Sequence, residues 1–250
     1  MNEDRQPGRI PLYVGQSHPC PYLEDRIALN HFADPTHLLS RPEYSALMSM
    51  GFRRSGEYVY RPACPECARC MSLRIDVEAF RPNRSQRRTL KANIGVRLKE
   101  TPPEYSDEAF SLYRRYLNAR HAGGEMAACE PGDFPGFLRA SWSDTRFLEL
   151  REHDRLLAVA ATDPLSDGLS AVYTWFEPGL PTRGLGVLAI LRQVEEARRR
   201  GLRWLYLGYW IPEARKMRYK TAYRPAQILI EGRWRVMDGK NEGSRFPARR

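Results

Sequence analysis

No apolar run in this 250-residue sequence approaches the roughly 18 residues that a membrane-spanning helix needs. The first residues, Met1 to Arg5, do not have the pattern of a signal peptide either. We therefore expect a cytoplasmic protein, in a compartment that keeps thiols reduced and disfavours disulfides. A Ser/His/Asp constellation is also missing, so the sequence does not point to an acyl-enzyme mechanism.

Lysine is scarce, since only five of the 40 basic residues are lysines. The 30 acidic residues leave a net charge of +10, which is compatible with a phosphate-bearing ligand or a nucleic acid. Acidic residues are absent between Ala79 and Lys99, where arginines alternate with Ser and Gln. This pattern favours phosphate contact over a merely solvated helix face. The predicted RNA-contacting arginines are Arg84, Arg87 and Arg88, with Arg53, Arg54 and Arg61 extending the surface.

Three of the five cysteines fall within seven residues, at Cys64, Cys67 and Cys70. Cys20, which precedes a proline, could supply a fourth thiolate. Such spacing is typical of tetrahedral zinc sites and of ferredoxin-type iron–sulfur clusters, and the sequence does not separate the two. His18 is an alternative ligand to Cys20, and four ordinary buried thiols are the alternative to any metal.

The N-terminal part of the chain predicts short strands and two helices. An alternating segment near Arg26–Phe32 favours a strand, and Pro42–Met50 favours a helix because proline suits a first turn. After the cysteines, Met71–Val77 alternates as a half-buried strand does. A short helix then runs through Asn93.

From residue 96 the predicted elements follow a different order. They are a strand at Val96–Glu100, a helix from an N-cap at Thr101 to Arg120, a helix at Pro131–Ser141, three strands near Arg146–Arg151, Leu156–Thr162 and Ser170–Phe176, a long helix to about Arg200, a strand at Trp204–Gly208, a helix at Glu213–Ala222, and closing strands at Ala226–Val236. This is the order of a GNAT-like acyltransferase domain. We therefore predict an α+β fold with a tail at 1–11, a smaller cysteine-bearing domain at 12–95, a GNAT-like domain at 96–238 and a tail at 239–250.

A glycine-containing turn opens the long helix, with Arg183, Gly184 and Gly186 in the sequence RGLG. In a GNAT-like domain the turn at this place presents backbone N–H groups to an anionic ligand. We predict that these three residues contact an anionic ligand such as the phosphates of an RNA, although a plain helix start would have the same sequence.

Several blocks in order resemble the aspartate/glutamate leucyltransferases, the bacterial relatives of eukaryotic arginyl-tRNA–protein transferases. The blocks are Cys20–Leu23, Gly51–Gly56, Tyr58–Pro62, the three clustered cysteines, Phe80–Arg88, Leu169–Tyr173, Gly208–Ile211 and Lys216–Lys220. The resemblance implies transfer of leucine from leucyl-tRNA to an N-terminal Asp or Glu, which marks the protein for degradation. An arginyl donor stays open. The transfer itself requires no cofactor, and this chain lacks the paired-cysteine pattern of the eukaryotic iron–sulfur relatives.

The resemblance also implies which residues act. An activated ester needs positioning and a neutral amine rather than covalent catalysis, and Asp163 is our candidate for orienting or deprotonating that amine, unless it only forms the turn before Pro164. An acidic substrate side chain needs a cationic partner. The predicted substrate-binding residues are Arg53, Arg54, Tyr209, Lys216, Arg218, Tyr219 and Lys220, with Lys216 and Lys220 expected on one helix face.

Two other functions explain part of the sequence. An acetyl-CoA-dependent GNAT N-acetyltransferase would account for the second domain but not for the clustered cysteines. A non-enzymatic RNA-binding protein with a structural zinc would account for the cysteines and the charge, but it would leave Gly208–Lys220 without a role.

Overall fold

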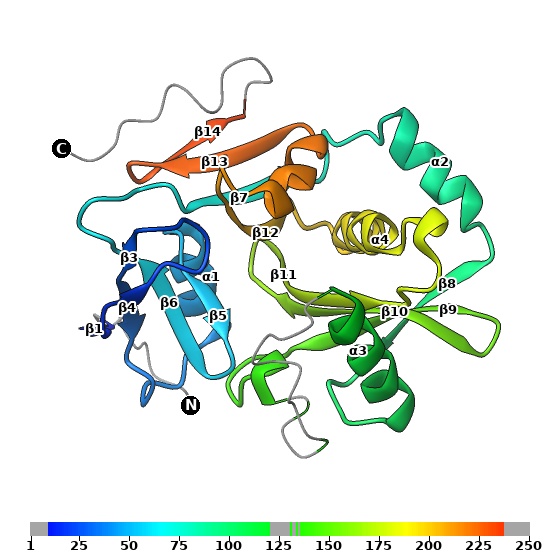
Figure 1. Cartoon of the computed structure of the whole chain (residues 1–250), viewed down its shortest axis with the longest axis horizontal. Helices are drawn as coiled ribbons and strands as arrows, with labels where there is room; N and C mark the ends of the chain where they lie inside the picture. The colour runs from blue at the N-terminus through cyan, green and yellow to red at the C-terminus, as the bar shows by residue number, and fades with distance from the viewer. Residues whose placement is uncertain (1–9, 121–130, 132–133, 135, 238–250) are drawn as a thin grey trace.

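The computed structural model describes residues 10–120, 131, 134 and 136–237, which form a small N-terminal unit packed against a large mixed sheet (Figure 1). The two predicted tails therefore fall almost wholly outside the described residues. None of the described helices combines the length and apolarity needed to cross a bilayer.

The N-terminal unit is built on a four-stranded antiparallel sheet in the order β1-β4-β6-β5. Its strands are β1 (Leu12–Val14), β4 (Asn30–Ala33), β5 (Arg53–Ser55) and β6 (Tyr58–Pro62), beside a two-stranded sheet of β2 (His18–Pro19) and β3 (Ile27–Ala28). Helix α1 (Arg41–Ser49) confirms the helix predicted at Pro42–Met50. It begins at a capping box in which Ser40 and Glu43 satisfy each other's backbone N–H groups.

The large sheet has eight strands in the order β14-β13-β7-β12-β11-β10-β9-β8, and all neighbours are antiparallel except β11 and β12. The strands are β7 (Met71–Asp76), β8 (Val96–Thr101), β9 (Arg146–Glu152), β10 (Arg155–Pro164), β11 (Gly168–Phe176), β12 (Trp204–Trp210), β13 (Ala226–Ile230) and β14 (Arg233–Val236). The predicted α+β class is confirmed.

Helices cover both faces of this sheet. Helix α4 (Leu185–Arg199) packs Leu185, Leu188 and Ala189 on Leu157 and Ala158 of β10, whereas α3 (Asp107–Arg120) packs on β10 residues of the other face, such as Val159. Alternation along β10 places Ala158 and Val159 on opposite faces, and a register shift between Leu156 and Ala158 lets the adjacent Leu157 and Ala158 face α4 together. Helix α2 (Arg84–Ala92) lies against α4, and short 3₁₀ helices are η2 (Gly136–Leu138), η3 (Pro181–Arg183) and η4 (Arg215–Ala222).

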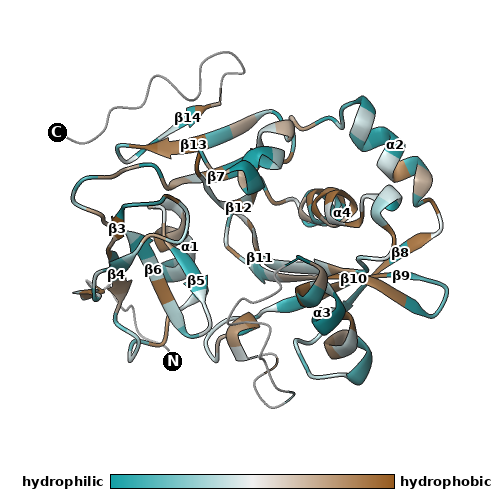
Figure 2. Cartoon of the chain, viewed as in Figure 1, coloured by the Kyte–Doolittle hydropathy of each residue, from teal (hydrophilic) through white to brown (hydrophobic). Residues whose placement is uncertain are grey.

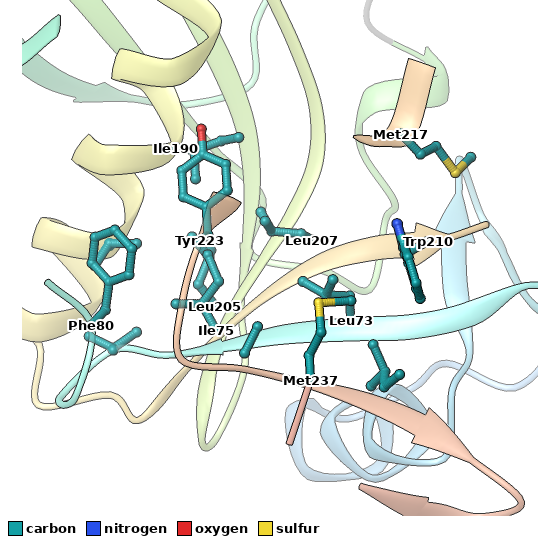
Figure 3. Close-up of a cluster of buried hydrophobic side chains, with 14 of the residues drawn as sticks. Leu73, Ile75, Phe80, Ile190, Leu205, Leu207, Trp210, Met217, Tyr223 and Met237 are labelled. Atoms are coloured by element: carbon teal, nitrogen blue, oxygen red, sulfur yellow. The ribbon is translucent and has the colours of Figure 1, made fainter. Parts of the chain in front are cut away.

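The main core joins β7, β12, α4 and η4. Figure 3 shows Leu73 and Ile75 of β7 beside Leu205 and Leu207 of β12. A second core spans the two units, because Tyr44, Met48 and Phe52 pack with Trp204 and Tyr206 of β12. The N-terminal unit therefore shares buried side chains with the large sheet.

Three predicted boundaries differ from the structure. β7 and α2 belong to the large sheet and its helix layer although they fall in the predicted domain 12–95, so the compact N-terminal unit ends after β6. Thr101 ends β8 instead of capping a helix; α3 begins later, where the Ser106 hydroxyl accepts the Ala109 N–H. Of the predicted helix Pro131–Ser141, the described residues contain only η2.

Candidate functional site

Strands β11 and β12 pair only at their beginnings and then diverge. Their parallel register covers Gly168–Ser170 and Trp204–Tyr206. Beyond it, the pairing of β12 with β7 is interrupted at residues 207 and 208 and resumes at Tyr209 and Trp210. Four successive β11 residues, 171–174, are half-buried in the middle of an eight-stranded sheet. β11 also has a bulge where Ala161 and Thr162 of β10 meet Tyr173 and Ala171. The divergence leaves part of the β12 edge without a strand partner (Figure 1).

Two cations satisfy this unpaired edge. The Lys220 ammonium on η4 donates to the carbonyls of Leu207 at 2.8 Å and Tyr209 at 2.6 Å. The Arg53 guanidinium on β5 donates to the Gly208 carbonyl at 3.1 Å through Nη2. Both side chains are more than nine-tenths buried. The point where β12 leaves β11 is therefore held by one cation from each structural unit.

Both cations keep unused donors beside Gly208. An ammonium has three protons and Lys220 uses two of them for these carbonyls, while Arg53 Nε is buried without any hydrogen-bond partner. A Cβ built on Gly208 would lie 3.7 Å from Lys220 Nζ and 3.8 Å from Arg53 Nε, so both donors border the same position. Gly208 has φ +76°, a conformation that disfavours a side chain.

No carboxylate neutralises these cations within the described part of the chain. Burial lowers the pKa of Lys220 to about 7, with a further contribution from the positive charge of Arg53. Burial also lowers the pKa of Arg53, and the interactions with Tyr209 and other nearby tyrosines, which raise this pKa, do not outweigh it. Two buried basic groups with spare donors are costly without an anion, and a carboxylate is an anion that such donors bind well.

Tyr209 links this position to the N-terminal unit. Its hydroxyl donates to the Gly51 carbonyl at 2.9 Å, and its ring centroid lies 5.4 Å from the Arg53 guanidinium carbon. Burial raises its pKa, so the hydroxyl stays protonated as a donor. Tyr209 therefore supports Arg53 from one side.

Asp163, the predicted base, has a different environment. Its carboxylate accepts from Arg54 Nε at 2.7 Å, Arg54 Nη2 at 2.9 Å, the Tyr44 hydroxyl at 2.9 Å and the Thr145 hydroxyl at 2.6 Å. The side chains of both Arg54 and Asp163 have no exposed surface. Burial alone would lower the pKa of Arg54, but the Asp163 carboxylate outweighs it and raises that pKa. A carboxylate enclosed by four donors does not fit the role of a base that approaches an amine.

The same pair removes Arg54 from the candidates for substrate binding, because its guanidinium is already occupied by Asp163. In strand β5, neighbouring side chains point to opposite faces. Arg54 therefore reaches Asp163 while Arg53 reaches Gly208. The ion pair joins β5 of the N-terminal unit to β10 of the large sheet.

The predicted helix Glu213–Ala222 is present as η4, but its geometry separates Lys216 from Lys220. A 3₁₀ helix has three residues per turn, so positions three apart share a face and positions four apart do not. Met217 and Lys220 are accordingly buried, whereas Lys216 and Arg218 are exposed. Lys216 lies 5.3 Å from the Tyr22 ring instead of facing Lys220. Tyr219 is half exposed.

All four predicted metal ligands, Cys20, Cys64, Cys67 and Cys70, line one cavity of about 370 Å³, together with Tyr209 of β12. Burial, and then electrostatic repulsion from the neighbouring Cys64, Cys67 and Cys20, raises the pKa of Cys70 to about 12. Among the described residues, no three His, Cys, Asp or Glu side chains come together in a way that could hold a metal ion. The arrangement thus does not fit a zinc or iron–sulfur site, and no step of a reaction is assigned to one.

The predicted RNA-contacting arginines of α2 lie on the surface. Arg84, Arg87 and Arg88 are exposed, and no described carboxylate forms an ion pair with any of them. Figure 2 shows α2 as hydrophilic over most of its length. Arg61 differs, because it is half-buried and donates to the Met50 carbonyl at 3.2 Å. Helix α2 therefore presents three exposed arginines that have no carboxylate partner among the described residues, although Arg87 donates to the Pro82 carbonyl at 2.7 Å.

The Arg183 turn is occupied by protein contacts instead of being open to an anion. Arg183 forms two bonds to Glu152, at 2.7 and 2.8 Å. A Cβ on Gly184 would lie 3.3 Å from the Thr89 hydroxyl, and one on Gly186 would lie 2.9 Å from the Phe176 ring. The two glycines allow α2 and β11 to pack closely against the start of α4, which explains them without a tRNA contact.

Two polar partners of the buried network, Tyr44 and Thr145, were not predicted. Tyr44 lies on the inner face of α1 and Thr145 precedes β9, far apart in the sequence. The one sequence signal concerns Tyr44, which falls on the apolar face of an amphipathic helix. A tyrosine hydroxyl that is buried in this way needs a hydrogen-bond partner.

Comparison with known proteins gives consistent similarity over nearly the whole chain. The family model described as Arginine-tRNA-protein transferase, C terminus, matches residues 108–230, and the one described as Arginine-tRNA-protein transferase, N terminus, matches residues 18–88. Proteins named Aspartate/glutamate leucyltransferase are similar as well. Those of Alkalilimnicola ehrlichii, Alcanivorax borkumensis and Thiobacillus denitrificans are 51%, 47% and 46% identical, over 90%, 90% and 92% of this chain and 95%, 93% and 96% of their own.

Proposed function

The chain belongs to the arginine-tRNA–protein transferase family, and we propose that it transfers leucine from leucyl-tRNA to the N-terminal Asp or Glu of proteins. The names of the similar leucyltransferases support the donor and the acceptor. The order of elements from β8 to β14 supports a GNAT-like domain that uses aminoacyl-tRNA in place of acetyl-CoA. The product would be a protein marked for degradation, and the reaction would take place in the cytoplasm, where charged tRNA is found.

The carboxylate position beside Gly208 carries this proposal. The acidic side chain of the acceptor would accept from Arg53 Nε and from the third proton of the charged Lys220 ammonium. A neutral side chain would leave both donors unpaired in a buried place, which costs more than the lost attraction alone. The site therefore selects proteins whose N-terminal residue is Asp or Glu and rejects those whose N-terminal residue has an uncharged side chain.

Little chemistry is left for the protein after binding. The ester of an aminoacyl-tRNA is already activated, and the acceptor amine must approach its carbonyl to about 3–3.5 Å. An N-terminal amine has an ordinary pKa near 7.7–8.0, so a useful fraction is neutral at physiological pH. Because Asp163 is enclosed, we attribute catalysis to positioning rather than to a dedicated carboxylate base. We also propose that the transfer requires no cofactor.

The donor tRNA would lie across the exposed arginines of α2. Arg84, Arg87 and Arg88 present guanidinium groups that form no ion pair with a described carboxylate, and they lie on one short helix, as phosphate contacts require. The family membership favours this reading over an acetyl-CoA enzyme and over a non-enzymatic RNA-binding protein.

The test combines donor choice with one substitution. Purified protein is given leucyl-tRNA or arginyl-tRNA and peptides that begin with Asp, Glu or Ala. We expect leucine on Asp and Glu peptides only. Arg53→Gln should lower kcat/KM for the Asp peptide by about 10- to 100-fold, as expected for the loss of a charged hydrogen bond, while Arg53→Lys retains part of the activity.

Arg61→Gln is the matched control, since Arg61 lies on the neighbouring strand β6 and contacts Met50 and Phe52. It should leave the preference for acidic peptides unchanged. Equal transfer to Asp and Ala peptides by the native protein would contradict the proposed carboxylate site. Transfer from arginyl-tRNA alone would contradict the leucyl donor.

A further inference from the structure

A line of aromatic side chains leads away from Lys220. The Tyr219 ring lies 5.9 Å from Lys220 Nζ. The pKa of Tyr219 is raised to about 12, mainly by burial and to a smaller extent by the nearby hydroxyl of Tyr116 on α3. Tyr116 contacts Phe176 of β11 edge to face, with ring centroids 4.9 Å apart. The Arg120 guanidinium lies 5.8 Å from the Phe176 ring. We call Tyr219, Tyr116 and Phe176 the ring track.

The ring track spans the place where β11 and β12 diverge. Its members come from η4, α3 and the end of β11, which Figure 1 shows around the point of divergence. None of the three rings is fully buried. Tyr113, one turn earlier on α3, has no exposed surface and packs edge to face against Trp175 in the core. Helix α3 therefore presents one ring to the core and one to the divergence.

The outer end of the ring track is positively charged. Arg120 is exposed, and no described carboxylate forms an ion pair with it. Arg115 on the same helix is instead paired with Glu177 at 3.0 Å. Partly exposed rings beside an arginine that has no described carboxylate partner form the combination that binds nucleic acid bases by stacking and their phosphates by charge.

We propose that the ring track binds the 3′-terminal bases of the donor tRNA. This inference rests on the proposed function, because the carboxylate beside Gly208 fixes where the acceptor amine lies. The ester carbon must come within about 3–3.5 Å of that amine, so the terminal nucleoside must lie close to Lys220. The ring track begins there and ends at the surface. Tyr116 stacks on the terminal base, and Arg120 binds a phosphate further along the strand.

The experiment separates the two substrates and the two ends of the ring track. KM is measured for leucyl-tRNA, for 3′-leucyl-adenosine and for an Asp peptide. Tyr116→Ala should raise KM for both donors by about tenfold or more, as expected for a lost stacking contact, with KM for the peptide unchanged. Tyr116→Phe keeps the ring and should stay within about twofold of the native protein.

Arg120→Gln tests the outer end without disturbing the core, because Arg120 is exposed. It should raise KM for leucyl-tRNA but not for 3′-leucyl-adenosine, because 3′-leucyl-adenosine contains no phosphate that Arg120 could bind. Arg114→Gln is the control, since Arg114 is also exposed on α3 but lies beside Phe110 instead of the ring track. It should leave all three KM values unchanged.

The outcomes distinguish this inference from the function on which it rests. A native protein that transfers no leucine would overturn the proposed function. An active native protein whose donor KM is unaffected by Tyr116→Ala would overturn the ring track alone. A rise confined to the peptide KM would also overturn it, because the rings would then contact the acceptor. If Tyr116→Ala does not fold, Arg120→Gln provides the test. An unchanged KM of Arg120→Gln for leucyl-tRNA would then contradict the proposal.

Discussion

Removing the Asp163 carboxylate should destabilise the protein strongly. Asp163→Ala would leave the Arg54 guanidinium charged, fully buried and without its two bonds from Nε and Nη2. Breaking a buried ion pair by removing one partner costs about 3–5 kcal/mol, because the remaining charge stays in a medium that solvates it poorly. The hydroxyls of Tyr44 and Thr145 lose an acceptor as well. For a chain of this size, that corresponds to a fall in Tm of about 6–20 °C.

Urea denaturation followed by tryptophan fluorescence would measure this change. Tyr44→Phe is the matched comparison, since it removes one of the four donors and keeps the ion pair, and it should cost only about 1–2 kcal/mol. An Asp163→Ala protein that unfolds within about 0.5 kcal/mol of the native one would refute the reasoning.

A second variant, Asp163→Asn, tests the alternative role of Asp163 as a base. Single-turnover transfer is measured at a temperature where Asp163→Asn remains folded. Loss of a general base would lower the rate by about 10²–10⁴-fold. A purely structural residue would leave the rate of the folded fraction close to native, which is the result that we expect from its enclosed position.

Gly208→Ala should lower kcat/KM for an Asp peptide at least tenfold, because the added Cβ would occupy the proposed carboxylate position. Gly232→Ala is the control for backbone strain, because Gly232 has a similar φ of +75° and open space around it, and this variant should remain active. The lowered pKa of Lys220, about 7, means that the unfolded chain binds one more proton between pH 7 and 10, so the free energy of unfolding should rise with pH in this window. Between pH 7 and 9, the increase in the free energy of unfolding measured by urea denaturation should be smaller for Lys220→Met than for the native protein, by up to about 2 kcal/mol. Replacing the three exposed arginines of α2 by Gln should weaken tRNA binding and reduce its salt dependence, with the slope of log affinity against log salt falling by about two to three; an unchanged slope would exclude α2 from the interface.

Local signals allowed the sequence to predict the elements that carry the site. A proline in the first turn predicted the helix that the structure has as α1, and the alternation of Met71–Val77 predicted a strand, which is largely buried as β7. Arg53 and Lys220 were predicted as carboxylate partners from their charge and from the family blocks, and the structure brings them to the same glycine.

Long-range contacts could not be predicted in the same way. The pairing of Arg54 with Asp163 joins residues 109 apart in the sequence, and no local pattern records it. The 3₁₀ form of η4, which separates Lys216 from Lys220, depends on Met217 packing into the core and on Lys220 reaching two carbonyls of β12. Gly184 and Gly186 have the sequence of an anion-binding turn, yet tertiary packing against Thr89 and Phe176 accounts for them.

The position of β7 has a consequence for how the chain is made. β7 is synthesised early, but both of its neighbours in the sheet, β12 and β13, follow roughly 130 or more residues later, which takes several seconds at a ribosomal rate of about 5–20 residues per second. During that interval Met71, Leu73 and Ile75 have neither strand partner beside them. The nascent chain therefore exposes an apolar strand until its C-terminal third emerges, and it offers a binding segment to chaperones throughout that time.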